Sequence, residues 1–307
     1  MAESAPPARP SLTRVWLRAI RPFSFPASIV PVAVGAACAA IADSFSAGLT
    51  LLTLLGCLAL QAGTNLANEF YDWRTGADHP GSLGASRAIM AGWLSPRAIF
   101  RAGVACFVVG CAAGLALVVV GGWPILVLGL IGVPLAFGYT APPLKLAYRG
   151  LGEVAVFFLM GPLMVLGSYL VQAGGSPATA LAASLPVGCL VAAILHANNV
   201  RDLDDDRRLG KRTLATILGR TGARREYDAL VGGAYLALLG GVIVGLLPWT
   251  SLLPLATLPL AVRVRALVAG SEDPRILDPT VRQTAGLHLV FGLLLAAGLL
   301  LGTWLPR

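Results

Sequence analysis

The chain has 307 residues, of which 56% are hydrophobic and only 12% are charged, and its mean hydropathy is +0.77. Because soluble globular proteins carry about a quarter charged residues, this composition excludes an ordinary soluble domain. Apolar runs of about 20 residues, enough to cross roughly 30 Å of hydrocarbon, recur along the whole length. The composition therefore predicts an all-α polytopic membrane protein.

Nine candidate membrane spans follow one another, and Pro254 and Pro259 interrupt the eighth. They are expected near residues 24–43, 47–68, 100–120, 122–140, 153–172, 179–199, 229–247, 250–268 and 285–305. The N-terminal stretch is rich in Pro and Ser. Residues 1–20 are therefore expected to form a disordered cytoplasmic tail, and residues 21–307 a single transmembrane domain.

Basic residues fall on one side of this arrangement. Lys and Arg occupy the N-terminal tail and the loops after the second, fourth, sixth and eighth spans, whereas the loops near 44–46, 121–123, 173–178 and 248–251 contain none. Cytoplasmic loops carry the excess of Lys and Arg in membrane proteins, so the N-terminus is predicted to be cytoplasmic. The formal net charge of +8 reflects this asymmetry and does not indicate nucleic-acid binding.

Two short polar strings interrupt the apolar sequence, each at the end of a predicted span. Each string holds an Asn and an Asp four residues apart, with a further Asp behind them: Asn68, Asp72 and Asp78 in the first motif, and Asn198, Asp202 and Asp206 in the second. Equivalent Asn and Asp residues of the two motifs stand 130 residues apart. At helical spacing, residues four apart share one face.

This duplicated pattern indicates one anionic site assembled from two halves. Clustered carboxylates repel unless a cation lies between them, and carboxylate and amide oxygens suit Mg²⁺ bound together with a phosphorylated ligand. The alternative is a solvated loop, and Asp204 and Asp205 fit that interpretation. The recurrence at two span ends favours a site, because polar groups there need a partner or a water-filled cavity.

Basic and aromatic side chains in the same loops extend the candidate site. Six basic residues are candidates for holding phosphate oxygens or, alternatively, topology anchors only: Arg87, Lys145, Arg149, Arg201, Lys211 and Arg212. Tyr139 closes the fourth span and either orients a substrate or anchors at the interface. Glu153 and His196 either belong to the site or serve only in the packing of the helices.

With these residues, the sequence resembles the UbiA superfamily of intramembrane prenyltransferases. The supporting strings run from Thr64 through Asp72 to Asp78, and from His196 through Asp202 and Asp206 to Ala215, with Arg21-Pro22 and Gly150 to Glu153 in addition. The likeness covers about residues 21–220. The likeness is greatest to the branch that prenylates 1,4-dihydroxy-2-naphthoate for menaquinone. The commoner spacing of the superfamily would place the third acid of the first motif at Gly76, whereas this sequence has it at Asp78, as that branch tends to.

The resemblance implies a nine-helix bundle in a bacterial cytoplasmic membrane, with its active site facing the cytoplasm. It also implies Mg²⁺ ions that bridge a polyprenyl diphosphate to the four aspartates of the motifs, with Asn68 and Asn198 in support. Asn68, Asp72, Asn198 and Asp202 are then the expected catalytic residues. The isoprenoid tail is expected between helices, open to lipid, and an aromatic ring attacks the allylic cation left when diphosphate departs.

Other functions remain open at this stage. The acceptor is 1,4-dihydroxy-2-naphthoate, or another phenol such as 4-hydroxybenzoate or homogentisate. A secondary transporter is a more distant alternative, since transporter sites lie near the bilayer midplane. Here the acids lie at helix ends.

Overall fold

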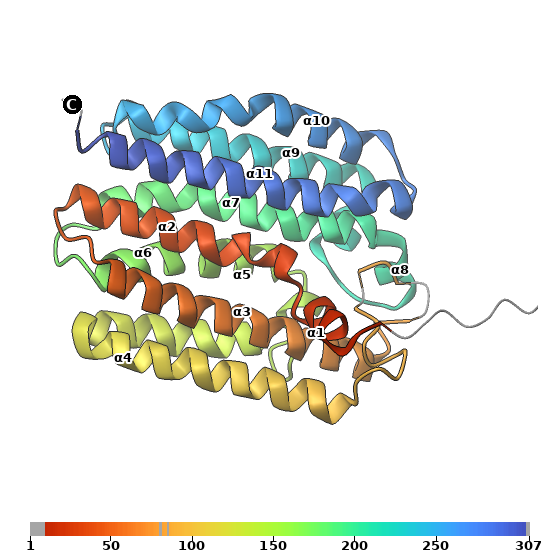
Figure 1. Cartoon of the computed structure of the whole chain (residues 1–307). Helices are drawn as coiled ribbons and strands as arrows, with labels where there is room; N and C mark the ends of the chain where they lie inside the picture. Colours follow the sequence, from red (N-terminus) through yellow and green to blue (C-terminus); the bar gives the residue numbers. More distant parts are fainter. Residues whose placement is uncertain (1–9, 80–81, 85, 305–307) are drawn as a thin grey trace, which may run out of the picture.

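The computed structural model describes residues 10–79, 82–84 and 86–304, and its long helices lie side by side in one bundle (Figure 1). The α-helices are α1 (Leu12–Ile20), α2 (Pro26–Ile41), α3 (Ala47–Thr75), α4 (Pro96–Phe137), α5 (Gly152–Phe158), α6 (Met164–Leu170), α7 (Ala178–Arg201), α8 (Leu203–Arg208), α9 (Leu214–Ile243), α10 (Leu258–Gly270) and α11 (Pro274–Leu301). A π-helical turn, Leu159–Leu163, joins α5 to α6, and a 3-10 segment, Trp249–Thr257, precedes α10. The all-α prediction is confirmed.

The helices agree with the predicted spans in position, and they define fewer full-length spans. In the described ranges, seven helices are long and apolar enough to cross a membrane, or up to eight if the pair Leu12–Ser24 and Pro26–Ile41, bent by 47°, forms one span. Helix α4 breaks at Gly122, where φ is 69°, and leaves the shorter apolar helix Trp123–Phe137. The exact count of nine stays a prediction.

Two helices begin well before their predicted spans. Helix α9 starts at Leu214, where Thr213 and Thr216 form a capping box, and α11 starts at Pro274 behind the Asp273 cap. In both helices the residues between the helix start and the predicted span include several charged side chains, so hydropathy does not reveal this part of the helix. Arg220, Arg224 and Arg225 therefore lie on a helix, whereas the predicted spans placed them in the loop between residues 199 and 229.

Part of the predicted N-terminal tail is helical. Helix α1 buries Val15 and Ala19 against a cluster that includes Leu66 and Ile99, while Arg14 and Arg18 stay exposed. This two-sided pattern stabilises a short helix at the end of the bundle, in contrast to the disorder expected for residues 1–20. Residues 1–9 lie outside the described residues.

Helices α3 and α4 approach closely along a seam of glycines, which we call the glycine seam. It consists of Gly56 and Gly63 on α3 and Gly103 and Gly110 on α4. A Cβ at Gly63 would lie 2.9 Å from the ring of Phe107, and one at Gly110 would lie 2.6 Å from the side chain of Leu60. Small residues let membrane helices pack with their backbones close together, so the seam sets the separation of α3 from α4.

A buried polar network joins α5, α7 and α9. His196 is fully buried; its Nδ1 lies 2.9 Å from Glu153 Oε1, and its Nε2 lies 2.8 Å from the carbonyl oxygen of Ala223. Both partners accept hydrogen bonds, so the geometry suits an imidazolium that donates from both nitrogens. Glu153 Oε1 also accepts from Asn199 Nδ2 at 2.8 Å. Glu226 lies 3.7 Å from His196 Nδ1 and makes no hydrogen bond to it.

The network predicts unequal effects on stability for its two glutamates. Glu153→Ala is expected to destabilise the protein by about 3–5 kcal/mol, because it leaves a buried cation and the Asn199 amide without their acceptor. Glu226→Gln is the matched control and should change the melting temperature little. Thermal unfolding of the purified protein in detergent measures both. Equal melting temperatures for Glu153→Ala and wild type would contradict the network.

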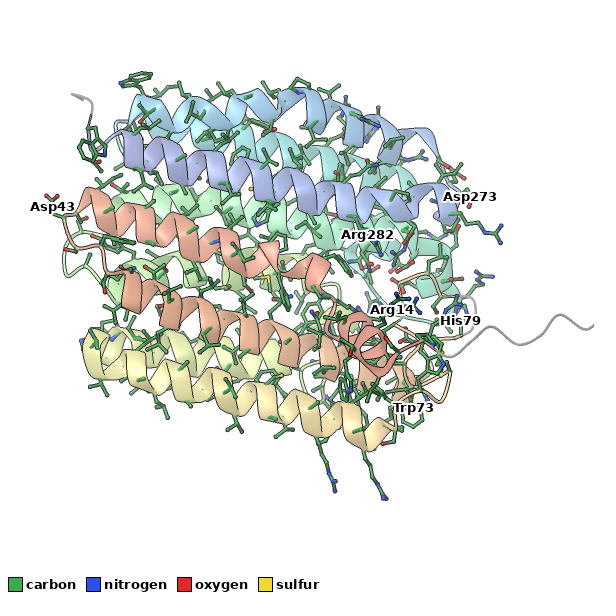
Figure 2. All side chains as sticks on the ribbon, in the orientation of Figure 1. Arg14, Asp43, Trp73, His79, Asp273 and Arg282 are labelled. Atoms are coloured by element: carbon green, nitrogen blue, oxygen red, sulfur yellow. The ribbon has the colours of Figure 1, made fainter. Side chains whose placement is uncertain are left out.

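The two ends of the bundle are predicted to face opposite sides of the membrane. Asp43 lies at one end, and His79 and Asp273 lie at the other (Figure 2). In a background without native cysteines, Arg207→Cys should react with a membrane-impermeant thiol reagent only from the cytoplasmic side, and Asp43→Cys only from outside. The reverse pattern would invert the predicted orientation.

Candidate active site

The ends of α3 and α7 bring the two motifs to one cavity. Asn68 and Asp72 lie on the last two turns of α3, Asn198 lies on the last turn of α7, and Asp202 caps that helix. Asn68, Asp72 and Asn198 all line the same cavity. Asp206 follows on the short helix α8. Segments 130 residues apart in the sequence thus contribute to one polar end of the bundle.

In the first motif, neutral hydroxyl groups hold the ligand-type oxygens. Tyr148 donates to Asp72 Oδ1 at 2.5 Å, and Thr140 donates to Asn68 Oδ1 at 2.7 Å. Beyond the left-handed Gly76, the chain turns back so that the Asp78 amide donates to the Asp72 carbonyl at 3.2 Å. Burial, followed by the nearby Asp72 carboxylate, raises the pKa of Asp78 to about 7. The loss of water around this carboxyl group is therefore the main reason that it resists ionisation.

In the second motif, a guanidinium group holds the oxygens. Arg201 donates to both carboxylate oxygens of Asp202 at 2.7 and 2.6 Å, and to Asn198 Oδ1 at 2.7 Å. Asp206 is 5% exposed and lies 3.3 Å from Lys211 Nζ, while its Oδ2 is buried without a hydrogen-bond partner. Burial raises the pKa of Asp206 to about 6 despite the nearby Lys211.

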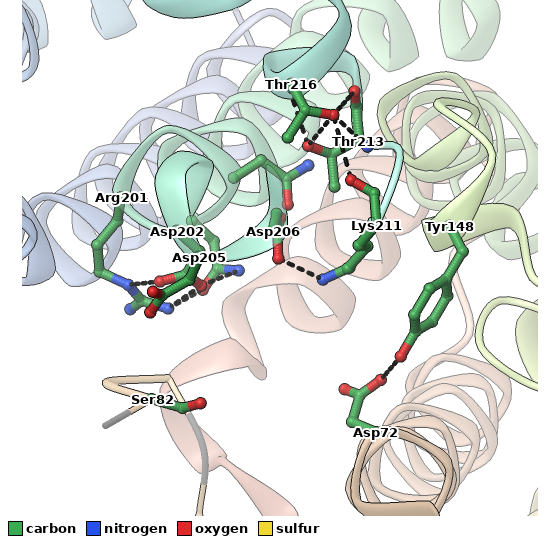
Figure 3. Close-up of polar contacts among 12 residues, drawn as sticks. Asp72, Ser82, Tyr148, Arg201, Asp202, Asp205, Asp206, Lys211, Thr213 and Thr216 are labelled. Carbon is green, nitrogen blue, oxygen red and sulfur yellow. Dashed lines mark hydrogen bonds and ion pairs between the residues drawn. The ribbon is translucent and has the colours of Figure 1, made fainter. Parts of the chain in front are cut away.

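Lys211 connects the two motifs electrostatically. Its ammonium group points toward Asp206 and lies 5.4 Å from the centre of the Tyr148 ring, beside Asp72 (Figure 3). Burial alone would lower the pKa of Lys211, but the carboxylates of Asp206, Asp72 and Asp202 outweigh it and raise that pKa above its usual range. Lys211 is therefore held as a cation between the motifs.

Below this polar end, the cavity continues as an apolar space of about 620 Å³. Its walls come from α2, α3, α4, the α5–α6 segment and α7, and residues such as Leu128, Met160 and Leu163 line it. Tyr139 stands at the polar end. One end of the cavity suits an anion, and the rest suits a hydrocarbon chain.

The other predicted basic residues lie farther from the cavity. Lys211 is the member of that set that lines it; Arg87, Arg149 and Arg212 are exposed, and Lys145 is half-buried. The backbones of Arg149 and Arg212 pair in an isolated β-bridge, which places the loops after α4 and α8 side by side. These side chains form part of the surface around the entrance, and their roles in binding stay predictions.

Several residues at the site have no recognisable signal in the sequence. Tyr148 is one of many aromatic residues near a span end, yet it contacts Asp72, and Asp278 reaches Arg201 from α11 at 2.8 Å. Arg21 lines the cavity and lies 3.5 Å from Glu69. Their sequence separations from their partners are too large for any local pattern to predict.

The donor set of the two motifs fits a hard divalent cation. Asn68, Asp72 and Asn198 line the cavity, while Asp78, Asp202 and Asp206 are not among its lining residues. A buried oxygen of Asp206 has no hydrogen-bond partner and is free to bind a cation. Within the described ranges, a different group, Glu153, His196 and Glu226, has its ligand atoms within 4.8 Å of one another. We interpret that group as an ion pair, because both His196 nitrogens already face acceptors.

Comparison with known proteins agrees with this geometry. A model of the UbiA prenyltransferase family matches residues 28–278. The chain is 31% identical to the 1,4-dihydroxy-2-naphthoate octaprenyltransferase of Bacillus subtilis (strain 168), covering 96% of this chain and 95% of that protein. It is 32% identical to the octaprenyltransferase of the same name from Escherichia coli (strain K12), covering 96% and 97%.

Solved structures share the fold. A UbiA homolog from Aeropyrum pernix K1 superposes with a TM-score of 0.69 at 20% identity, over 92% of this chain and 98% of that one. A UbiA homolog from Archaeoglobus fulgidus, bound to DMAPP and Mg²⁺, gives a TM-score of 0.66 at 18% identity, over 92% and 99%. Family match, near-full-length relatives and fold agree: the chain belongs to the UbiA prenyltransferase family and is an integral-membrane prenyltransferase.

Proposed function

We propose that the protein transfers a polyprenyl group from a polyprenyl diphosphate to 1,4-dihydroxy-2-naphthoate, with Mg²⁺, in menaquinone biosynthesis. The observation that carries this proposal is the cavity itself, in which two Asn/Asp motifs and Lys211 form one polar end of a long apolar space. The proposal includes a bacterial cytoplasmic membrane and a site that faces the cytoplasm. We also propose that residues 21–307 act as one transmembrane domain.

The relatives support the choice of substrates. Those from Bacillus subtilis and Escherichia coli are both named for 1,4-dihydroxy-2-naphthoate. The Archaeoglobus fulgidus homolog is bound to DMAPP and Mg²⁺ in one structure and to GPP and Mg²⁺ in another. The separation of an anionic end from an apolar wall in this chain fits a ligand with a diphosphate head and an isoprenoid tail.

Six oxygen-bearing residues would hold the metal: Asn68, Asp72, Asp78, Asn198, Asp202 and Asp206. When bound, Mg²⁺ would neutralise the negative charge that builds on the departing diphosphate. Lys211 adds a fixed positive charge at the same place, and such preorganised charges stabilise a transition state more strongly where water is excluded. The apolar walls keep water from the allylic cation until the electron-rich ring of the acceptor attacks it.

Product analysis by mass spectrometry tests the proposal. The purified protein in nanodiscs receives Mg²⁺, a polyprenyl diphosphate, and either 1,4-dihydroxy-2-naphthoate or 4-hydroxybenzoate, with a chelator-treated sample as control. We expect a prenylated product that has lost CO₂ from the naphthoate, and no product after chelation. If prenylated hydroxybenzoate were the only product, the acceptor would be 4-hydroxybenzoate and not 1,4-dihydroxy-2-naphthoate. With neither product and the diphosphate intact, the proposed reaction would be wrong.

Substitutions in the two motifs test the metal site. Asp72→Asn and Asp206→Asn should each lower turnover by a factor on the order of 10² or more, because each removes a charged ligand from the site. Asp204→Asn is the matched control: Asp204 lies on the same short helix as Asp206, but it is exposed and pairs with Arg220. Initial rates at equal amounts of membrane-inserted protein measure the effect. Near-normal rates in both motif variants would contradict the assignment.

A further inference from the structure

Arg201 holds Asn198 and Asp202 of the second motif with a single buried cation, whereas Asp206 pairs with Lys211. Its Nε and Nη2 engage both carboxylate oxygens of Asp202, and Nη2 also donates to the amide oxygen of Asn198. The Arg201 side chain is only 4% exposed. All three of these oxygens are therefore already occupied by one positive charge.

The first motif differs in this respect. Asp72 and Asn68 accept hydrogen bonds from the hydroxyl groups of Tyr148 and Thr140, which carry no charge. A divalent cation at Asp72 would meet neutral donors, whereas one at Asp202 would meet a guanidinium group at contact distance. Because like charges repel strongly where water is scarce, the contacts of Arg201 with these oxygens weaken the binding of a divalent cation there.

A second acid, Asp278, pairs with the Arg201 guanidinium group at the nitrogen that does not contact Asp202. Arg201 Nη1 donates to Asp278 Oδ1 at 2.8 Å, and Asp278 lies on α11 with a side chain that is 43% exposed. Arg201 can therefore release Asp202 and Asn198 and still keep a counter-charge. This contact also connects the C-terminal helix to the site.

Because Gly84 has no side chain, it makes room for the guanidinium group of Arg201. A Cβ at Gly84 would lie well inside contact distance of Arg201 Nη2, and its next neighbours would include Asn198 Oδ1 at 3.6 Å. Gly84 is not among the positive-φ glycines, so its backbone accepts an alanine. The loop behind the first motif thus packs directly on the cation that occupies the second.

We propose that Arg201 is the resident cation of the second motif, and that it yields Asn198 and Asp202 to a divalent metal only when a diphosphate arrives. The proposal rests on the proposed function, since it assumes that the second motif takes metal. A diphosphate presents paired oxygens that Arg binds bidentately, and these replace the contacts that Arg201 gives up. Metal and diphosphate therefore enter the second motif together. Arg201 binds the diphosphate in this step, and Asp278 and Gly84 position its guanidinium group.

Mn²⁺ binding, measured by electron paramagnetic resonance on the full-length protein in detergent without diphosphate, tests the proposal. Arg201→Gln and Gly84→Ala should each tighten Mn²⁺ binding by about tenfold, a typical size for coupling between sites. Arg207→Gln removes an exposed charge nearby and should leave binding unchanged. Gly84→Ala keeps every ligand and every charge, so it separates displacement of the guanidinium from a general change in charge.

Added pyrophosphate tests the joint entry of metal and diphosphate. The gain in Mn²⁺ affinity that pyrophosphate produces should be larger in wild type than in Arg201→Gln, because the variant has no guanidinium to displace. Comparing the two proteins cancels the binding of Mn²⁺ by pyrophosphate in solution. An equal gain in both proteins would overturn the proposal.

Controls separate failure of this proposal from failure of the proposed function. If, with pyrophosphate present, Asp72→Asn and Asp202→Asn bind Mn²⁺ as wild type does, the motifs are not a metal site and both proposals fall. If those variants lose Mn²⁺ while Arg201→Gln and Gly84→Ala match wild type, only the role of Arg201 is overturned. Thermal unfolding reports whether each variant is folded. If Arg201→Gln is unfolded, the Mn²⁺ affinity of Gly84→Ala tests the role of Arg201.

Discussion

The site depends on carboxylates held close together against their mutual repulsion. Two unit charges 4 Å apart interact by about 4 kcal/mol at an effective dielectric constant near 20. Burial raises the pKa of Asp78 to about 7 and that of Asp206 to about 6, which shows how strongly the bundle disfavours further negative charge there. Lys211 and Arg201 offset part of this excess. Under the proposed function, the remaining negative charge is what would attract a divalent cation.

Different parts of the helices carry the two motifs and form the cavity wall. The ends of α3 and α7 carry the two motifs, while their apolar lengths, with α4 and the α5–α6 segment, form the cavity wall. The two motif helices are supported in different ways. Helix α7 is connected to α5 and α9 through the charged network around His196, whereas α3 packs against α4 through the glycine seam. Helix α3 is also held by polar contacts, because Asn65 Nδ2 donates to the carbonyl oxygen of Ile20 at 2.7 Å and to Ser24 Oγ at 2.9 Å.

Much of the arrangement could be predicted, because the relevant patterns are local. Helical spacing and the repeated offset identify both motifs, and hydropathy locates the helices. The site assignments themselves stay predictions. Contacts between distant segments could not be predicted, since Tyr148 is 76 residues from Asp72 and Asp278 is 77 from Arg201. Hydropathy also misses the charged N-terminal parts of α9 and α11, which capping and ion pairs such as Arg220–Asp204 and Arg201–Asp278 hold in place.

The geometry of the first motif depends on the lack of side chains along the glycine seam. Gly63 lies nine residues before Asp72, which is roughly 13 Å along a helix, and Gly56 lies one further heptad away. A methyl group added at either position would wedge α3 away from α4, and the helix would transmit that tilt to its end. The close packing along the seam therefore sets how far the carboxylates of the first motif stand from those of the second.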